Sequence, residues 1–213
     1  MSRRCLYCVV LLVSQIQHLH ARDAYQLQIL IVDRAQTQPL VLHSAMGQAA
    51  RLLAAAGVKS SWRMCPASSI PPDSQPCAEM GSLSLTLRVL PAKEAVAWPV
   101  DRNSCGMAIA GASGEHGSLA IIDADCIARM SASRPGAQIA LLAHVFAHEL
   151  GHLLLGRDSH SIGLMSARWT KAELTLLVRD QLAFTDLDAA KLREAMSIRA
   201  LAPAKSSDPI PAR

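Results

Sequence analysis

Two histidines and a glutamate in the segment AHELGH, residues 147–152, have a spacing that suits metal chemistry. On a helix, side chains four residues apart lie on one face, so the imidazoles of His148 and His152 can reach the same ion. Glu149 is rotated from them by roughly 100°, which places its carboxylate beside such an ion. A carboxylate in that position can act as general base toward a zinc-bound water. The pattern therefore predicts a catalytic zinc site on a helix.

Two histidines are an incomplete ligand set, because a catalytic zinc ion usually has three protein ligands and one water. Gly156 is placed to end the helix and to reverse the chain, and His160 then lies within reach of the metal. Asp158, in the same turn, and Glu173, on a following helix, are the alternatives. We favour His160 as third ligand on ligand type and reach.

The whole segment HELGHLLLGRDSHSIGLM resembles the metzincin clan of zinc peptidases, in which H-E-x-x-H-x-x-G-x-x-H is followed by a turn with a methionine. A serine after the third histidine is similar to the matrixin version. The resemblance implies one catalytic Zn²⁺ held by His148, His152 and His160. It also implies that Glu149 is the general base and that Met165 forms an apolar floor beneath the metal.

The spacing to the third histidine departs from the clan's pattern. Seven residues separate His152 from His160, where the clan has five. Gly156 comes one position late, and Asp158 occupies the expected place of the third histidine. An insertion of two residues is tolerable in a turn, and the order of histidine, serine and methionine is kept. We therefore retain His160, with Asp158 and a gluzincin-type ligand Glu173 as alternatives.

Hydrophobic periodicity predicts the elements that position this segment. Strands are expected at 25–33, 58–65, 82–90, 107–112 and 118–124, and helices at 42–58, 137–155, 170–181 and 185–200. This order predicts an α/β (α+β) domain. The metzincin resemblance implies that a small mixed twisted sheet lies over the zinc-binding helix, followed by the methionine turn and C-terminal helices.

The two ends of the chain differ in composition from its centre. Two arginines precede a short apolar run near the N-terminus, which predicts a secretory signal peptide over residues 1–21. The run is too short to span a bilayer, and the alternative is a buried first strand or helix. Residues 22–200 are then one catalytic domain, and the tail 201–213, rich in Pro and Ser, is expected to be disordered.

Four cysteines remain once the signal peptide is removed, which fits two disulfides in an exported protein. Four cysteines permit three pairings. In one of these pairings, Cys65 with Cys77 would close a proline-rich loop and Cys105 with Cys126 would then tie the next segment together, but the sequence leaves the pairing open. If the N-terminal run is not a signal peptide, four reduced and buried thiols are the alternative.

These patterns lead to one functional prediction. We expect a secreted or periplasmic zinc endopeptidase that acts on peptide or protein substrates, with one catalytic Zn²⁺ and Glu149 activating the attacking water. The resemblance implies that substrate lies extended along an edge strand within 105–122. The chain has a net charge of +4, but its sequence contains no basic run with interleaved aromatic residues, so nucleic acid is not an expected partner. We expect a monomer without a stable membrane anchor.

Three other interpretations of residues 144–165 stay open. One is a gluzincin-type zinc hydrolase with Glu173 as third ligand. Another is a non-catalytic binding domain that a metal stabilises. The last is a core helix whose histidines are satisfied by hydrogen bonds, in which case Glu149 would be buried at a cost of several kcal/mol unless it found a partner. His144, one turn before His148, is expected to pack or to support the site rather than bind metal.

Overall fold

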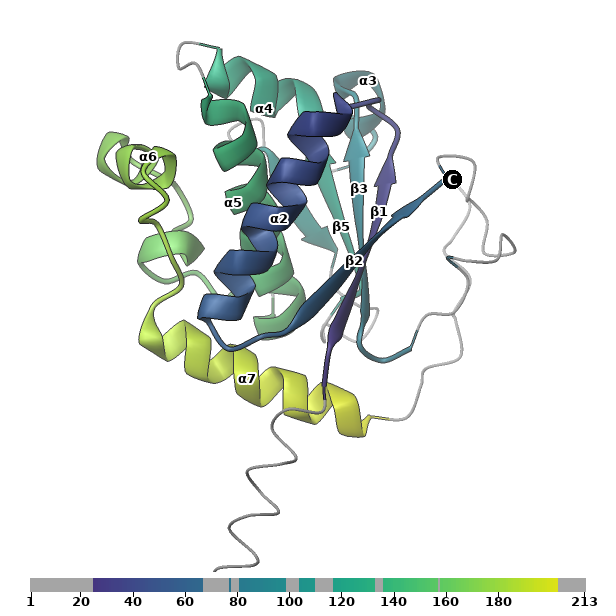
Figure 1. The fold of residues 1–213 in the computed structure, drawn as a ribbon, viewed down its shortest axis with the longest axis vertical. Helices are drawn as coiled ribbons and strands as arrows, with labels where there is room; N and C mark the ends of the chain where they lie inside the picture. The colour runs from purple at the N-terminus through teal and green to yellow at the C-terminus, as the bar shows by residue number, and fades with distance from the viewer. Residues whose placement is uncertain are drawn as a thin grey trace, which may run out of the picture.

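One sheet and a set of helices make up the part of the chain that the computed structural model describes, namely residues 25–66, 77, 81–98, 104–109, 117–132, 136–156 and 158–202. The strands are β1 (Leu27–Asp33), β2 (Ser60–Cys65), β3 (Ser84–Leu90), β4 (Gly106–Ile109) and β5 (Leu119–Asp123). The helices are α2 (Pro39–Ala55), α3 (Ala92–Ala95), α4 (Ala124–Ser131), α5 (Ala137–Leu155), α6 (Lys171–Val178) and α7 (Asp186–Leu201), with a 3₁₀ turn at Gly163–Met165. This arrangement confirms the predicted mixed α/β fold class (Figure 1).

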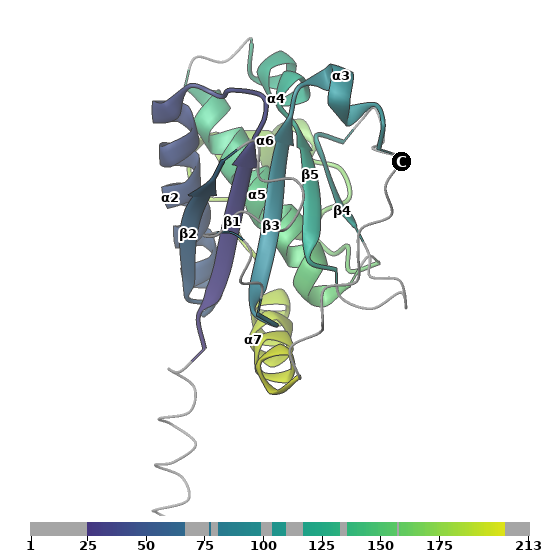
Figure 2. The same cartoon turned by 90° about the vertical axis from the view of Figure 1, so that its right-hand side faces the viewer.

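The five strands form one mixed sheet in the order β2-β1-β3-β5-β4. β1 pairs in parallel with β2 and β3, and β3 pairs in parallel with β5. β4 runs antiparallel to β5 and forms one edge of the sheet, at the end away from β2 (Figure 2). The antiparallel edge strand therefore lies within the range 105–122 in which an edge strand was expected.

Alternation along β1 gives the sheet two different apolar faces. Leu27, Ile29 and Ile31 pack in the main core with residues of α2 and α5, whereas Leu30 and Val32 point to the opposite face. Parallel strands are usually covered on both faces, which explains the nearly continuous apolar run in β1. The main core thus lies between the sheet and the helix pair α2 and α5.

Helix α5 lies at the centre of the fold. Fifteen of its 19 residues are buried, because it packs on the sheet, on α2 and on the C-terminal helices. A helix that is apolar nearly all round is typical of such a central position. By length and composition α5 also resembles a membrane span, but 78% of its apolar window is buried inside the fold. The apolar surface of α5 is therefore accounted for by the protein core.

Helix α2 differs from its predicted bounds at both ends. It begins at Pro39, three residues before the predicted start, because the fixed φ of proline suits the first helical residue and its missing N–H is not needed there. It ends at Ala55, three residues before the predicted end, because the chain leaves the helical conformation at Gly57. Gly57 has a φ of 83°, and the N–H of Val58 donates to the carbonyl of Leu53 at 2.9 Å.

Two short helices were not predicted from the sequence. α4 follows β5 without a loop, because Asp123 ends the strand and also caps the helix by accepting from the N–H of Cys126 at 3.0 Å. α3 places one helical turn between the strand predicted at 82–90 and the strand predicted at 107–112, where no element was predicted. Both helices are too short for a helical period to be visible in the sequence.

A few other expectations meet the structure only in part. Within the strand predicted at 58–65, Val58 is buried and precedes β2, Trp62 is partly buried, and Met64 is exposed because β2 is an edge strand. The predicted signal peptide (1–21) and nearly all of the predicted tail (201–213) lie outside the described residues.

The structure contains two disulfides, as the count of cysteines predicted, and it settles their pairing. Cys65, the last residue of β2, is bonded to Cys77, and their Cα atoms are 6.1 Å apart. Cys105, just before β4, is bonded to Cys126 in α4, with Cα atoms 5.3 Å apart. The second bond fixes the start of the edge strand to the helix that follows β5.

Replacing both Cys105 and Cys126 by serine should lower the free energy of unfolding by about 3 kcal/mol, because the bond closes a loop of 21 residues in the unfolded chain. Urea unfolding of the oxidised parent and the double variant measures this difference. Equal stabilities would show that the bond does not constrain the chain.

Candidate metal centre

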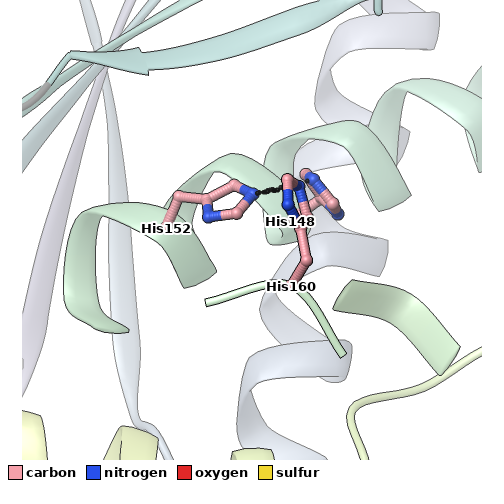
Figure 3. Close-up of side chains that lie close together, drawn as sticks. All are labelled: His148, His152 and His160. Atoms are coloured by element: carbon pink, nitrogen blue, oxygen red, sulfur yellow. Dashed lines mark hydrogen bonds between the residues drawn. The ribbon is translucent and has the colours of Figure 1, made fainter. Parts of the chain in front are cut away.

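Three imidazole rings meet at the C-terminal half of α5. His148 and His152 lie one helical turn apart, and their Nε2 atoms are 3.1 Å from each other. The Nε2 atom of His160, from the segment after α5, is also 3.1 Å from that of His152. All three ligand atoms lie within 4.8 Å of one another. Figure 3 shows the rings turned toward a common centre.

Hydrogen bonds on the far side of the two helix-borne rings decide which nitrogen carries the proton. His148 Nδ1 is 2.8 Å from the carbonyl of Leu164, which can only accept, so Nδ1 holds the proton. His152 Nδ1 lies 3.1 Å from the hydroxyl of Ser159, which itself donates to the carbonyl of Gly156 at 2.6 Å. The serine oxygen therefore accepts from His152 Nδ1. In their neutral forms both rings keep a lone pair on Nε2.

The two Nε2 lone pairs face each other at 3.1 Å, and such an arrangement is repulsive unless a cation lies between them. Zinc–nitrogen bonds of about 2.0–2.1 Å in a tetrahedral site place neighbouring ligand nitrogens slightly more than 3 Å apart. The three histidines therefore fit a zinc ion in both donor type and spacing.

The protonation of the histidines agrees with a ligand role. Burial lowers the pKa of His148 below its usual value of 6.5, despite the hydrogen bond to Leu164. Burial, with the nearby His148, lowers the pKa of His152 to about 4. Both rings are therefore neutral near pH 7, which is the form that binds a metal.

Glu149 lies beside this cluster and against the edge strand. Its side chain is buried, at 3% exposure, and the N–H of Ala108 in β4 donates to it. A Cβ atom on Gly106 would lie 2.5 Å from the carboxylate Oε1, so only glycine leaves room at that position. In the metal-free protein, burial raises the pKa of Glu149 to about 8. A dication nearby would favour the charged carboxylate.

The turn that follows the third histidine packs beneath α5. Met165 is fully buried, and a Cβ on Gly151 would lie 2.5 Å from its Sδ atom, so the methionine sits under the helical turn between the two histidines. Trp169 donates from Nε1 to the carbonyl of Leu164 at 3.2 Å, and its ring lies edge-on to that of His148 at 5.7 Å. The turn thus supplies an apolar floor and a hydrogen-bond acceptor.

A buried aspartate, which sequence reasoning did not assign to the site, holds the segment with the third histidine. Asp188 is 2% exposed and accepts from the hydroxyl of Ser161, the neighbour of His160, at 2.9 Å. The same carboxylate accepts from the hydroxyl of Thr185 at 2.7 Å and caps α7. The sequence indicated the cap, but the contact with Ser161 joins residues 27 positions apart and has no local signal.

The alternative ligands and His144 lie elsewhere. The group of close ligand atoms includes neither Asp158 nor Glu173 among the described residues. Glu173 accepts from the N–H of Thr170 and from the hydroxyl of Ser166, each at 2.7 Å, and these bonds lower its pKa. His144 is fully buried. Its two ring nitrogens lie 2.7 Å and 3.0 Å from main-chain carbonyls, in keeping with a packing role.

Comparison with known proteins identifies a similar fold. No family model and no curated protein matches the sequence. The structure is similar to the crystal structure of archaemetzincin from Methanopyrus kandleri, with a TM-score of 0.53 and 16% sequence identity. The match covers 82% of this chain and 98% of that chain. The likeness shows that the chain has a metzincin-like fold, as the sequence predicted. The matrixin-like features of the motif stay a prediction.

Replacing Ser161 by alanine should weaken Zn²⁺ binding by about tenfold or more, because loss of a group that orients a ligand commonly costs 10–100-fold in metal affinity. Titration of the metal-free protein against a zinc chelator measures this change. Ser197→Ala is the matched control, because the Ser197 hydroxyl is exposed and donates to the carbonyl of Arg193 within α7. Equal zinc affinities in the two variants would show that Ser161 does not support zinc binding.

Replacing Glu149 by glutamine should stabilise the metal-free protein increasingly as the pH rises. The folded pKa of Glu149, about 8, is above the ordinary value of 4.5, so the parent loses stability between pH 4.5 and 8 as the buried group ionises. The variant does not titrate there, and the histidines contribute equally to both proteins. The stability difference should therefore grow by about 3 kcal/mol between pH 5 and 8.

Urea unfolding at these two pH values, in chelator-treated protein, gives the comparison directly. A difference that does not change with pH would show that Glu149 is solvated or paired in the metal-free protein.

Proposed function

We propose that this protein is a zinc-dependent endopeptidase in which His148, His152 and His160 hold one Zn²⁺ and Glu149 is the general base. The observation that carries the proposal is the convergence of three imidazole Nε2 atoms beside a buried carboxylate. The metzincin-like fold supports it, because the similar structure is that of an archaemetzincin. The gluzincin alternative is less well supported, since the Glu173 carboxylate is bonded to the start of its own helix.

Zinc in such a site supplies a Lewis acid, which lowers the pKa of water to about 7 and stabilises negative charge on the scissile carbonyl oxygen. The chain's own contribution is to keep three imidazoles aimed at one point. The carbonyl of Leu164 and the hydroxyl of Ser159 do this by fixing the protons of His148 and His152 on Nδ1.

Glu149 has the position and the environment of a proton carrier. It accepts a proton from the attacking water, a bond forms between the water oxygen and the scissile carbon, and the carbon–nitrogen bond then breaks. The proton passes from Glu149 to the leaving amine. The contacts with Gly106 and Ala108 fix the carboxylate against β4 while this occurs.

The edge strand supports a peptide as the substrate. β4 is paired with β5 on one side and lies at the end of the described sheet. An extended peptide that paired with the free edge of β4 would pass next to Glu149, which contacts two residues of that strand. In this proposal β4 aligns the main chain of the substrate, and the peptide bond is cleaved next to Glu149 of α5.

The proposed setting is outside the cytoplasm. Two disulfides and an N-terminal pattern of arginines followed by an apolar run support export, as a secreted or periplasmic protein. We further propose that residues 1–21 are a signal peptide, that residues 22–200 form one catalytic domain, and that the protein works as a monomer without a stable membrane anchor or nucleic-acid partner.

Glu149→Gln should keep zinc and lower kcat on a quenched fluorescent peptide library by a factor of about 10²–10⁴, because the amide cannot accept the proton. Glu173→Gln is the control, and should keep both zinc and turnover. Full activity in the Glu149 variant would contradict the mechanism. Loss of zinc in the Glu173 variant would favour the gluzincin alternative, and no cleavage by the zinc-loaded parent would favour a binding domain.

A further inference from the structure

A basic pocket is lined by residues at the carboxyl ends of β1 and β3, by residues of α3 and by the residues that follow α3. Figure 1 shows α3 next to the carboxyl end of β3. Its volume is about 350 Å³, and the residues that line it are Arg34, Arg88, Leu90, Lys93, Glu94, Ala97 and Trp98. We call it the Arg88 pocket. None of these residues takes part in the candidate metal centre.

The strand alternation places Arg88 on the face opposite the metal centre. Its neighbours along β3, Leu87 and Val89, pack in the main core with α5, so Arg88 points the other way. On the adjacent strands its register partners are Val32 and Ile121, both of them buried. The side chain of Arg88 thus projects from a central strand of the sheet, between the side chains of Val32 and Ile121.

The charges that line the pocket do not balance. Three of the lining side chains are cationic, and Glu94 is the single carboxylate among them. Glu94 is already engaged, because Arg34 donates to it from Nε at 2.5 Å and from Nη2 at 3.2 Å. Arg88 and Lys93 are therefore not neutralised by any acidic side chain that lines the pocket.

Arg88 has a particular need for an anionic partner. Its Nε atom is buried and has no hydrogen-bond acceptor within the described part of the chain. Burial and the nearby Arg34 lower the pKa of Arg88, yet an arginine side chain stays charged in proteins. A buried donor of a charged group that lacks a partner is costly. A ligand oxygen would satisfy it.

The other wall of the pocket is apolar. Leu90 is buried and packs with Ala95 and Ile121, and the half-buried ring of Trp98 lies against the same cluster. The pocket is also at the lower end of the 300–1,000 Å³ that ligand sites usually enclose. Its chemistry is therefore that of a small site with cations on one side and an aromatic surface on the other.

We propose that the Arg88 pocket binds a carboxylate carried on a flat apolar body, with the carboxylate on Arg88 and Lys93 and the apolar body against Leu90 and Trp98. A free aromatic acid and the C-terminal carboxylate of a peptide that ends in an aromatic residue share this chemistry. The site is independent of the proposed peptidase activity, because it lies on the other face of the sheet.

The test is isothermal titration of the purified protein, freed of metal so that no carboxylate binds zinc. The probes are 3-phenylpropionate for a free acid and N-acetylphenylalanine for a peptide C-terminus. N-acetylphenylalaninamide, without a carboxylate, and inorganic phosphate, without an apolar body, are the ligand controls. We expect at least one acid to bind at least tenfold more tightly than either control, and the stronger acid identifies the source.

Arg88→Lys keeps the charge and loses Nε, and should weaken binding of the acid at least tenfold. Lys93→Met tests the second cation at an exposed position where folding is not at risk, and should also weaken it. Arg51→Met removes an exposed charge on α2 and should leave binding unchanged. The proposal is overturned if no acid binds, if phosphate binds as well as the acids, or if all three variants behave alike.

Discussion

The repulsion between two nitrogen lone pairs is the constraint on which the candidate site depends. His148 and His152 are both neutral, both carry the proton on Nδ1, and point Nε2 atoms at each other across 3.1 Å on a helix that is otherwise core. Side-chain packing alone gives no reason to hold two lone pairs in this way. A cation between them turns the repulsion into two bonds, and His160 completes a set of three.

The chain after α5 is organised around the polar groups of that helix. The carbonyl of Leu164 accepts from His148, the Ser159 hydroxyl accepts from His152, and the carbonyl of Leu182 binds His144. Each acceptor comes from a different part of residues 156–185. These segments are in turn held by Asp188 at the start of α7. Burial of a polar helix face is tolerable here because every ring has a partner.

The carboxylate that we propose as general base depends on the sheet instead. Glu149 is fixed by Gly106 and Ala108 of β4, and the disulfide between Cys105 and Cys126 ties the start of that strand to α4. In the proposed site, α5 thus supplies two of the three ligands and the base, while the edge strand sets the position of the base. In the proposed mechanism the same strand aligns the substrate, so base and peptide bond are positioned by one element.

Local patterns in the sequence were sufficient for the five strands, for α2, α5, α6 and α7, and for the cluster of histidines. The i, i+4 spacing placed two rings on one face, Gly156 predicted the end of α5, and the cap of α6 at Thr170 was visible in four residues. The short helix α4 was missed because eight residues hold too little periodicity. The contacts of Asp188 with Ser161 and of Gly106 with Glu149 join distant segments, and no local pattern encodes such pairs. The partial burial of Arg88 could not be predicted from the sequence either. Alternation in β3 places Arg88 on the second face of the sheet, but it does not indicate that α3 and Trp98 partly enclose that face.

Zinc content per folded chain, measured in the purified parent and in His160→Ala, tests the central claim most directly. We expect one zinc per parent chain and a much lower content in the variant at equal free zinc, because three imidazoles hold the ion and the variant has two. A folded parent that holds no zinc, or a variant that retains zinc as well as the parent does, would contradict the three-histidine site.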